Sequence, residues 1–245
     1  WDLRRLTPWG QEVTFTAFAR GDVYHSDENL LSPTLIYRGS PGWESRAIGA
    51  LAVDVRWPLI GPVGSNGTQR ITPRLQLVAT PPIRNLEIPN EDARAIELED
   101  SNLFALNRFP GYDRFEDGAR ITYGVDYSLT LPGISVDANI GQSYRLSDRP
   151  ALFPDGVGLT DKLSDIVGRT TVRFRDFVSL THRYRLDKDN LAVRRNEIDA
   201  TIGSRQTYLL LGYLRLNRDI DTSIEDLRDR EEIRVGGRVQ IGRFW

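Results

Sequence analysis

The chain has 245 residues, of which 40% are hydrophobic and 27% are charged, and it contains neither Cys nor Met. This apolar content excludes a disordered protein, and the lack of Cys excludes a disulfide framework, a zinc ribbon and a thiol nucleophile. The 32 basic and 34 acidic residues give a net charge of −2, which does not favour nucleic acid as a partner. Because the chain has no Met to start translation, we expect a processed or excised piece of a longer protein.

Alternation of apolar and polar residues is the main pattern along the chain. It is clearest over residues 119–131, where apolar side chains at odd positions oppose polar or small ones at even positions. A tight turn at residues 131–133 leads into a second alternating segment, so the two predict a hairpin. The whole chain predicts ten strands, at about residues 11–24, 46–57, 70–80, 118–130, 134–146, 167–175, 177–186, 191–203, 206–217 and 231–242. Helix is expected only as a turn around residues 160–166.

Strand and loop lengths favour a membrane barrel. Several expected strands have about ten or more residues, which suits a tilted strand that crosses a bilayer in about 9–11 residues. Outer-membrane barrels alternate long external loops with short periplasmic turns. The expected long connections are residues 25–45, 81–117, 147–166 and 218–230, and the links between them, including 58–69, are mostly short. Residues 187–190 are too short for this alternation.

The expected fold class is therefore all-β, an antiparallel transmembrane β-barrel of the outer-membrane type. Residues 1–245 would be a portion of one large barrel domain, and residues 81–117 a long loop insertion within it. One apolar face of the strands would meet hydrocarbon and the other face would line a polar interior. A soluble barrel or sandwich can show the same alternation, but it would bury its apolar faces against each other.

A polar and aromatic motif occupies the end of the 81–117 segment. Residues 103–118 read LFALNRFPGYDRFEDG and lead into a strand that contains Thr122, Tyr123 and Gly124. This order resembles the barrel domain of the LptD/OstA family, the outer-membrane proteins that insert lipopolysaccharide. Weaker similarity extends over about residues 69–168. The residues that carry the motif are Asn107, Arg108, Gly111, Tyr112, Asp113 and Arg114.

The resemblance implies a barrel of about 26 strands, preceded by a periplasmic β-jellyroll. It implies a location in the cell outer membrane of a Gram-negative bacterium. The implied partners are lipopolysaccharide, membrane lipid, an LptE-type plug lipoprotein, and a periplasmic lipopolysaccharide-bridge protein that docks on the jellyroll. Ten strands are too few for that barrel, so we expect the jellyroll, the lateral-gate strands and the family's Cys residues to lie outside this chain. An open sheet of this kind exposes two edges and is not expected to fold alone.

Two groups of residues are candidates for handling cargo. The motif loop either lines or gates the path of an amphiphile, or is anchored to the barrel rim by its aromatic residues and by a pair between Asp113 and an arginine. Guanidinium groups on the polar face can bind phosphate bidentately, although any water-filled barrel needs a polar interior. The polar-face candidates are Arg70, Arg74, Arg120, Asp126, Arg145, Arg183, Arg185, Arg234 and Arg238.

No catalytic, metal or cofactor site is predicted. His182 falls on an apolar face and Ser179 on the opposite one, so the two do not form a nucleophile and base. His25 has no third ligand nearby, and no phosphate-binding glycine motif is present. We therefore expect a non-enzymatic translocon that inserts lipopolysaccharide into the outer leaflet. A porin-like passive diffusion channel is the alternative, with a soluble carbohydrate-binding β-protein less favoured.

Overall fold

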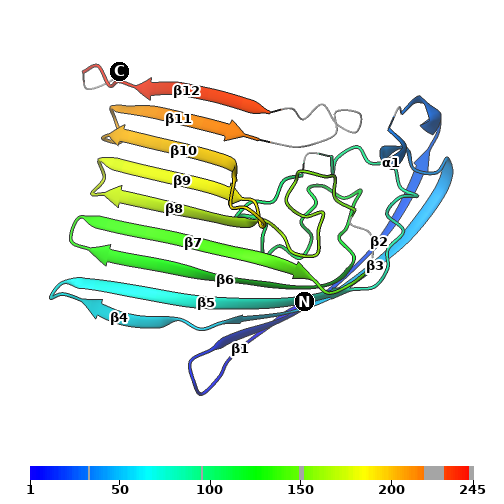
Figure 1. The fold of residues 1–245 in the computed structure, drawn as a ribbon, viewed down its shortest axis with the longest axis horizontal. Helices are drawn as coiled ribbons and strands as arrows, with labels where there is room; N and C mark the ends of the chain where they lie inside the picture. The colour runs from blue at the N-terminus through cyan, green and yellow to red at the C-terminus, as the bar shows by residue number, and fades with distance from the viewer. Residues whose placement is uncertain (33, 95, 149–151, 218–228, 243–245) are drawn as a thin grey trace.

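The computed structural model describes residues 1–32, 34–94, 96–148, 152–217 and 229–242, which form a single antiparallel sheet (Figure 1). Its strands are β1 (Asp2–Leu6), β2 (Glu12–Ser26), β3 (Gly42–Arg56), β4 (Leu59–Val63), β5 (Gly67–Thr80), β6 (Gly118–Leu131), β7 (Ile134–Arg145), β8 (Ile166–Phe174), β9 (Val178–Leu186), β10 (Val193–Gly203), β11 (Tyr208–Leu216) and β12 (Arg230–Arg238). Helix in these ranges is limited to η1 (Asn29–Leu31) and α1 (Leu35–Arg38).

The strands follow one another as a meander. The order across the sheet is β1-β2-β3-β5-β6-β7-β8-β9-β10-β11-β12, and β4 pairs with β5 beside β3. In the described part of the chain β1 and β12 do not pair with each other, so the sheet is open. No helix in this part is long and apolar enough to cross a membrane.

The prediction of an all-β antiparallel fold is confirmed, and each of the ten expected strands is present with shifted ends. Two strands were missed. β1 is short and mostly polar, and β4 reads LIGPV, in which Pro62 is tolerated because β4 has a single neighbouring strand. The expected short link at residues 58–69 is therefore another hairpin, with its turn at residues 64–66.

The helical turn expected around residues 160–166 is wrong. Leu163 forms an isolated bridge with Tyr144, and the N–H of Ser164 donates to the carbonyl of Ser143 at 2.9 Å. Pairing with the end of β7 thus holds this segment extended up to β8. Of the expected loop at residues 218–230, residues 218–228 lie outside the described residues.

The strand register separates the side chains onto two faces. Asp54, Gln76, Thr122 and Ser143 stand side by side on the polar face of β3, β5, β6 and β7. On the apolar face of the same strands the side chains include Leu51, Leu77, Ile121, Ile140 and Tyr144. This face is uncovered in the described part of the chain: Leu51 is 64% exposed and Ile140 is 47% exposed.

The polar face carries a layer of loops. We call residues 81–94, 96–117 and 152–165 the loop layer; Figure 1 shows these connections gathered on the side toward which β2 and β3 curve. Its main apolar cluster includes Leu98, Phe109, Phe153 and Val157 and packs on Val167 of β8. A second cluster joins Phe115 to Ile48 and Ala50 of β3. The buried core therefore lies between the loop layer and the polar face.

Candidate functional site

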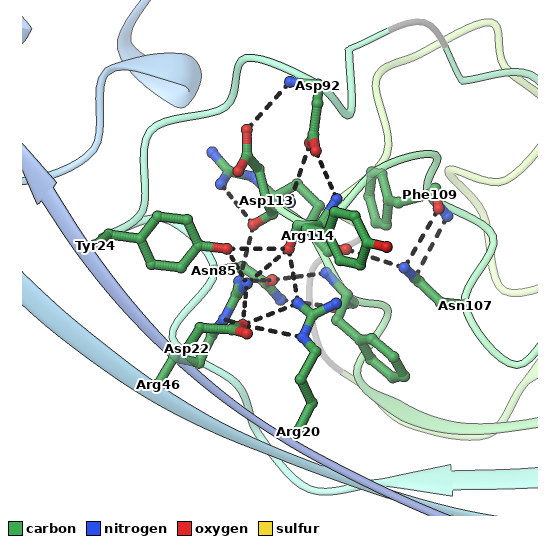
Figure 2. A network of polar contacts seen from close by, with 12 residues as sticks. Arg20, Asp22, Tyr24, Arg46, Asn85, Asp92, Asn107, Phe109, Asp113 and Arg114 are labelled. Atoms are coloured by element: carbon green, nitrogen blue, oxygen red, sulfur yellow. Dashed lines mark hydrogen bonds and ion pairs between the residues drawn. The ribbon is translucent and has the colours of Figure 1, made fainter.

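Asn107 holds together the two ends of the motif loop. Its Nδ2 donates to the carbonyl oxygens of Arg114 at 3.0 Å and Phe109 at 3.3 Å, and its Oδ1 accepts from the N–H of Glu116 at 3.0 Å. A single amide side chain thereby satisfies backbone groups on both sides of Pro110 and Gly111. Figure 2 shows Asn107 beside Phe109.

Arg108 and Arg120 bind Glu116 from two sides. Arg108 Nε donates to Glu116 Oε2 at 2.7 Å, Arg120 Nη1 lies 3.0 Å from the same oxygen, and the three side chains are buried. Burial alone raises the pKa of Glu116, but the two guanidinium groups outweigh it and hold this pKa below its ordinary value. Because Arg120 lies on β6 and the other two residues lie in the loop, the triad joins the motif to the sheet.

Gly111 allows the backbone to approach Asp92. Its φ is +71°, and a Cβ there would lie 2.2 Å from Asp92 Cγ, so another residue type would be strained and would clash. The Asp92 carboxylate accepts from the N–H groups of Tyr112 at 2.7 Å and Asp113 at 3.0 Å. Burial raises the pKa of Asp92, but the hydrogen bonds from these backbone N–H groups lower it by more. The net pKa of Asp92 is therefore below its ordinary value.

Asp113 secures the loop through backbone groups. Its Oδ2 accepts from the N–H groups of Glu91 at 2.7 Å and Asp92 at 3.1 Å. The expected arginine contact involves the main chain of Asp113 and not its carboxylate, since Arg46 Nη1 donates to the carbonyl oxygen at 2.8 Å.

Arginines of β2 and β3 donate hydrogen bonds to the main chain of the motif, as Figure 2 shows. Arg46 Nη2 and Arg20 Nη2 both donate to the carbonyl of Tyr112, at 2.8 and 2.7 Å, and both pair with Asp22. Arg114 donates to the carbonyls of Ile88 at 2.7 Å and Ile36 at 2.8 Å, and burial lowers its pKa to about 10.

A second set of ion pairs joins the loop layer to β9 and β10. Glu97 lies 3.3 Å from Arg185 and 3.2 Å from Arg195, and Glu99 lies 2.8 Å from Arg195. Arg185 also pairs with Asp165 at 3.2 Å, and only 1% of its side chain is exposed. Burial raises the pKa of Asp165 despite the attraction of Arg185. Arg185 is therefore occupied by acidic groups of the loop layer.

The register places every polar-face candidate on one face, but in different surroundings. Arg120, Arg145 and Arg185 contact the loop layer, with Arg145 Nη2 donating to the carbonyl of Thr160 at 2.9 Å. Arg74 pairs with Asp54 at 2.6 Å and lies over the Phe104 ring. At the other end of the sheet Arg234 pairs with Asp199 at 2.8 Å and Arg238 is exposed.

Three of the candidates, Arg70, Asp126 and Arg183, line an open polar hollow of about 470 Å³. It lies beside the loop layer, toward the short connections of the sheet. Such a hollow can hold a hydrated or anionic group. Its other charged lining residues are Glu12, Arg56, Asp137, Arg169 and Arg173.

The sequence pattern did not point to Asp22, Asp92, Glu97, Arg169 or Arg195. A signal was present for Asp22, because Arg20, Asp22 and Tyr24 alternate with apolar or small residues near the end of a strand. No local signal marks Asp92 or Glu97, since their partners lie far away in sequence.

His182 lies on the face that the alternation predicts, and His25 lies near the end of β2. His182 faces away from Ser179 and its Nε2 lies 2.9 Å from Asn196 Oδ1, while His25 packs on Trp43. Within the described ranges no group of three or more His, Cys, Asp or Glu residues could hold a metal ion.

Comparison with known proteins agrees with the motif. The model of the LptD family, described as LPS transport system D, matches residues 1–245. The chain is 30% identical to the LPS-assembly protein LptD of Polaromonas sp. (strain JS666) over 76% of this chain and 22% of that protein. It is 32% identical to that of Albidiferax ferrireducens over 67% and 21%, and 37% identical to that of Acinetobacter baylyi over 33% and 10%.

The chain thus spans about a fifth of the length of the first two of these relatives. The family model covers all of it, including the motif loop and the strands on either side. The chain belongs to the LptD family.

Proposed function

We propose that this chain forms part of the wall of a transmembrane β-barrel in the outer membrane of a Gram-negative bacterium. The observation that carries this proposal is the uncovered apolar face. Large side chains such as Leu51, Leu75 and Leu77 stand exposed there, whereas the core lies on the other face. Water does not favour so wide an apolar surface, and bilayer hydrocarbon would cover it.

We further propose that the intact protein inserts lipopolysaccharide into the outer leaflet without enzymatic chemistry. The relatives described above are named LPS-assembly proteins. Lipopolysaccharide carries phosphates that guanidinium groups of the polar face would bind, while its acyl chains would leave sideways into lipid. Its partners would be membrane lipid, an LptE-type plug lipoprotein and a periplasmic bridge protein. The last of these would dock on a jellyroll outside this chain.

Within that barrel domain, residues 81–117 would act as an inserted loop that closes part of the interior. The loop layer is tied to the wall by buried ion pairs such as Arg120 with Glu116 and Arg185 with Glu97. A loop fixed in this way speaks against a freely open porin-like channel. The uncovered apolar face speaks against a soluble carbohydrate-binding protein.

Photo-crosslinking in cells tests the cargo. A crosslinking amino acid replaces Arg70 or its neighbour Ile71 in the full-length protein; the two point to opposite faces, near a short turn of the sheet. We expect a lipopolysaccharide adduct on immunoblots from position 70, which faces the interior, and none from position 71, which faces inner-leaflet phospholipid. Equal adducts at both positions, or none at 70, would contradict the proposal.

A further inference from the structure

Two arginines face each other across β8 and β9. Arg169 and Arg183 are direct partners in the register, and both line the polar hollow. Like charges placed directly opposite on neighbouring strands destabilise a sheet unless an anion lies near them. Each side chain remains partly open to water, Arg169 by 41% and Arg183 by 32%.

Asp100 of the loop layer reaches this pair without binding it closely. One carboxylate oxygen lies 3.6 Å from Arg169 Nε and the other lies 4.0 Å from Arg183 Nε, although only 4% of the Asp100 side chain is exposed. Both distances exceed the usual length of a charged hydrogen bond. The pair is therefore only partly neutralised from the loop side. Arg183 also contacts Glu197 and Asp199, and both arginines line the hollow.

The next arginine pair offers a comparison within the same molecule. Arg185 and Arg195 are direct partners across β9 and β10, and Glu97 of the same loop segment lies 3.3 and 3.2 Å from them. Arg185 is buried, Arg195 is partly buried, and both are closely neutralised, so this pair serves to hold the loop. The pair of Arg169 and Arg183 differs in two ways. Asp100 of the loop layer lies farther from its guanidinium groups, and the hollow adjoins them.

The charge of the hollow suits an anion. Five arginines and three carboxylates line it, so basic groups outnumber acidic ones among the lining residues. Outside the lining, Arg183 contacts Glu197 and Asp199, and Arg56 contacts Asp54. Arg173 pairs with Asp137 at 3.1 Å, but both side chains are about half exposed, and ion pairs in water are weak enough to exchange. A phosphate monoester presents several oxygens to a guanidinium group and can bind it bidentately. The Asp100 carboxylate lies too far from either guanidinium group to do so.

We propose that the hollow is a binding site for phosphate monoesters on sugars, with Arg169 and Arg183 as its ligands and Asp100 as a built-in competitor. The assignment to cargo rests on the proposed function. Short connections face the periplasm in outer-membrane barrels, so the hollow would meet the sugar phosphates of incoming lipopolysaccharide below the loop layer. The incoming phosphate would displace Asp100 and thereby weaken the hold of the loop on β8 and β9.

Calorimetry that measures the binding of glucosamine 6-phosphate to the full-length protein in detergent tests this site. Asp100→Asn should tighten binding about two- to fivefold, because it removes a weak competing ion pair. Arg169→Gln should weaken binding about tenfold, because it removes a charged hydrogen-bond donor. The matched controls are Asp176→Asn and Arg205→Gln, exposed in short turns outside the hollow, and these should bind as the unchanged protein does.

Two further ligands identify what is recognised. Glucosamine without phosphate should not bind. Inorganic phosphate should bind with the same dependence on Asp100 and Arg169 if the site recognises the phosphate group alone. Equal binding of glucosamine, or no change in either variant, would overturn the inference. Because Asp100→Asn keeps both arginines, it gives a result even if Arg169→Gln fails to fold. The result of the calorimetry does not change the result of crosslinking at position 70. The phosphate site and the proposed function can therefore fail separately.

Discussion

Glu116 ties the motif loop to the sheet, because its buried carboxylate neutralises both Arg108 and Arg120. Glu116→Gln would leave two buried guanidinium groups without their anion. Removing one partner of a buried ion pair costs about 3–5 kcal/mol. We expect this loss in the free energy of local opening of the loop, measured by hydrogen exchange of its amides. Glu91→Gln, an exposed change in the same loop, is the control and should have little effect.

The same carboxylate makes loop opening depend on pH. The pKa of Glu116 is lowered in the folded protein, so its stabilisation is complete above the ordinary Glu pKa of about 4.3. It is lost as the pH falls from there through the folded pKa. The free energy of loop opening, obtained from exchange rates corrected for the intrinsic amide rate at each pH, should therefore fall on acidification in the unchanged protein and much less in Glu116→Gln. Identical pH profiles would show that Glu116 does not hold the loop.

At this scale the sequence reveals residue types but not their partners. Asn107, Arg108, Gly111 and Asp113 were recognisable because they are close together in one motif. Their anchors, among them Asp92 and Arg46, lie elsewhere in the chain, so spacing gives no hint of the contact. Asp113 shows the limit: a carboxylate beside arginines was expected to pair with one, and it instead accepts backbone N–H groups.

Within single strands the central question is which face meets lipid. Val125 of β6 is partly exposed on the apolar face, and Asp126 lies on the polar face. Val125→Arg should lower the free energy of unfolding in bilayers by about 2–4 kcal/mol if the position lies near the midplane. Asp126→Asn should be far milder. Urea unfolding of the full-length protein in lipid vesicles measures both, and no loss for Val125→Arg would refute this orientation.

Strands were predictable where both faces carry a signal. Over residues 119–131 the period of two and the turn that follows locate β6 and β7 almost to the residue. β1 lacks apolar alternation and β4 contains Gly61 and Pro62, so both escaped notice. The turn expected around residues 160–166 failed because pairing with β7 overrides local preference there.

For the whole molecule the distribution of its core is the main result. A single sheet has its buried clusters on the polar face, beneath the loop layer, and none of the described residues covers its apolar face. The alternation predicted two unlike faces and the polar candidates on one of them. It could not predict which arginines contact the loop layer, since that depends on how residues 81–117 and 152–165 fold over the sheet. The arrangement separates structural arginines such as Arg185 from those that border open space, such as Arg169.

The most direct test of the proposed lipid-facing wall is a scan of single cysteines over residues 119–131 in the full-length protein, in bilayers that contain a lipid-linked nitroxide. Each cysteine carries a fluorescent label whose quenching reports contact with hydrocarbon. The account predicts strong quenching at odd positions such as 121, 123 and 125, and weak quenching at even positions such as 122, 124 and 126. Quenching without a period of two, or protection of the odd positions by other protein segments, would contradict it.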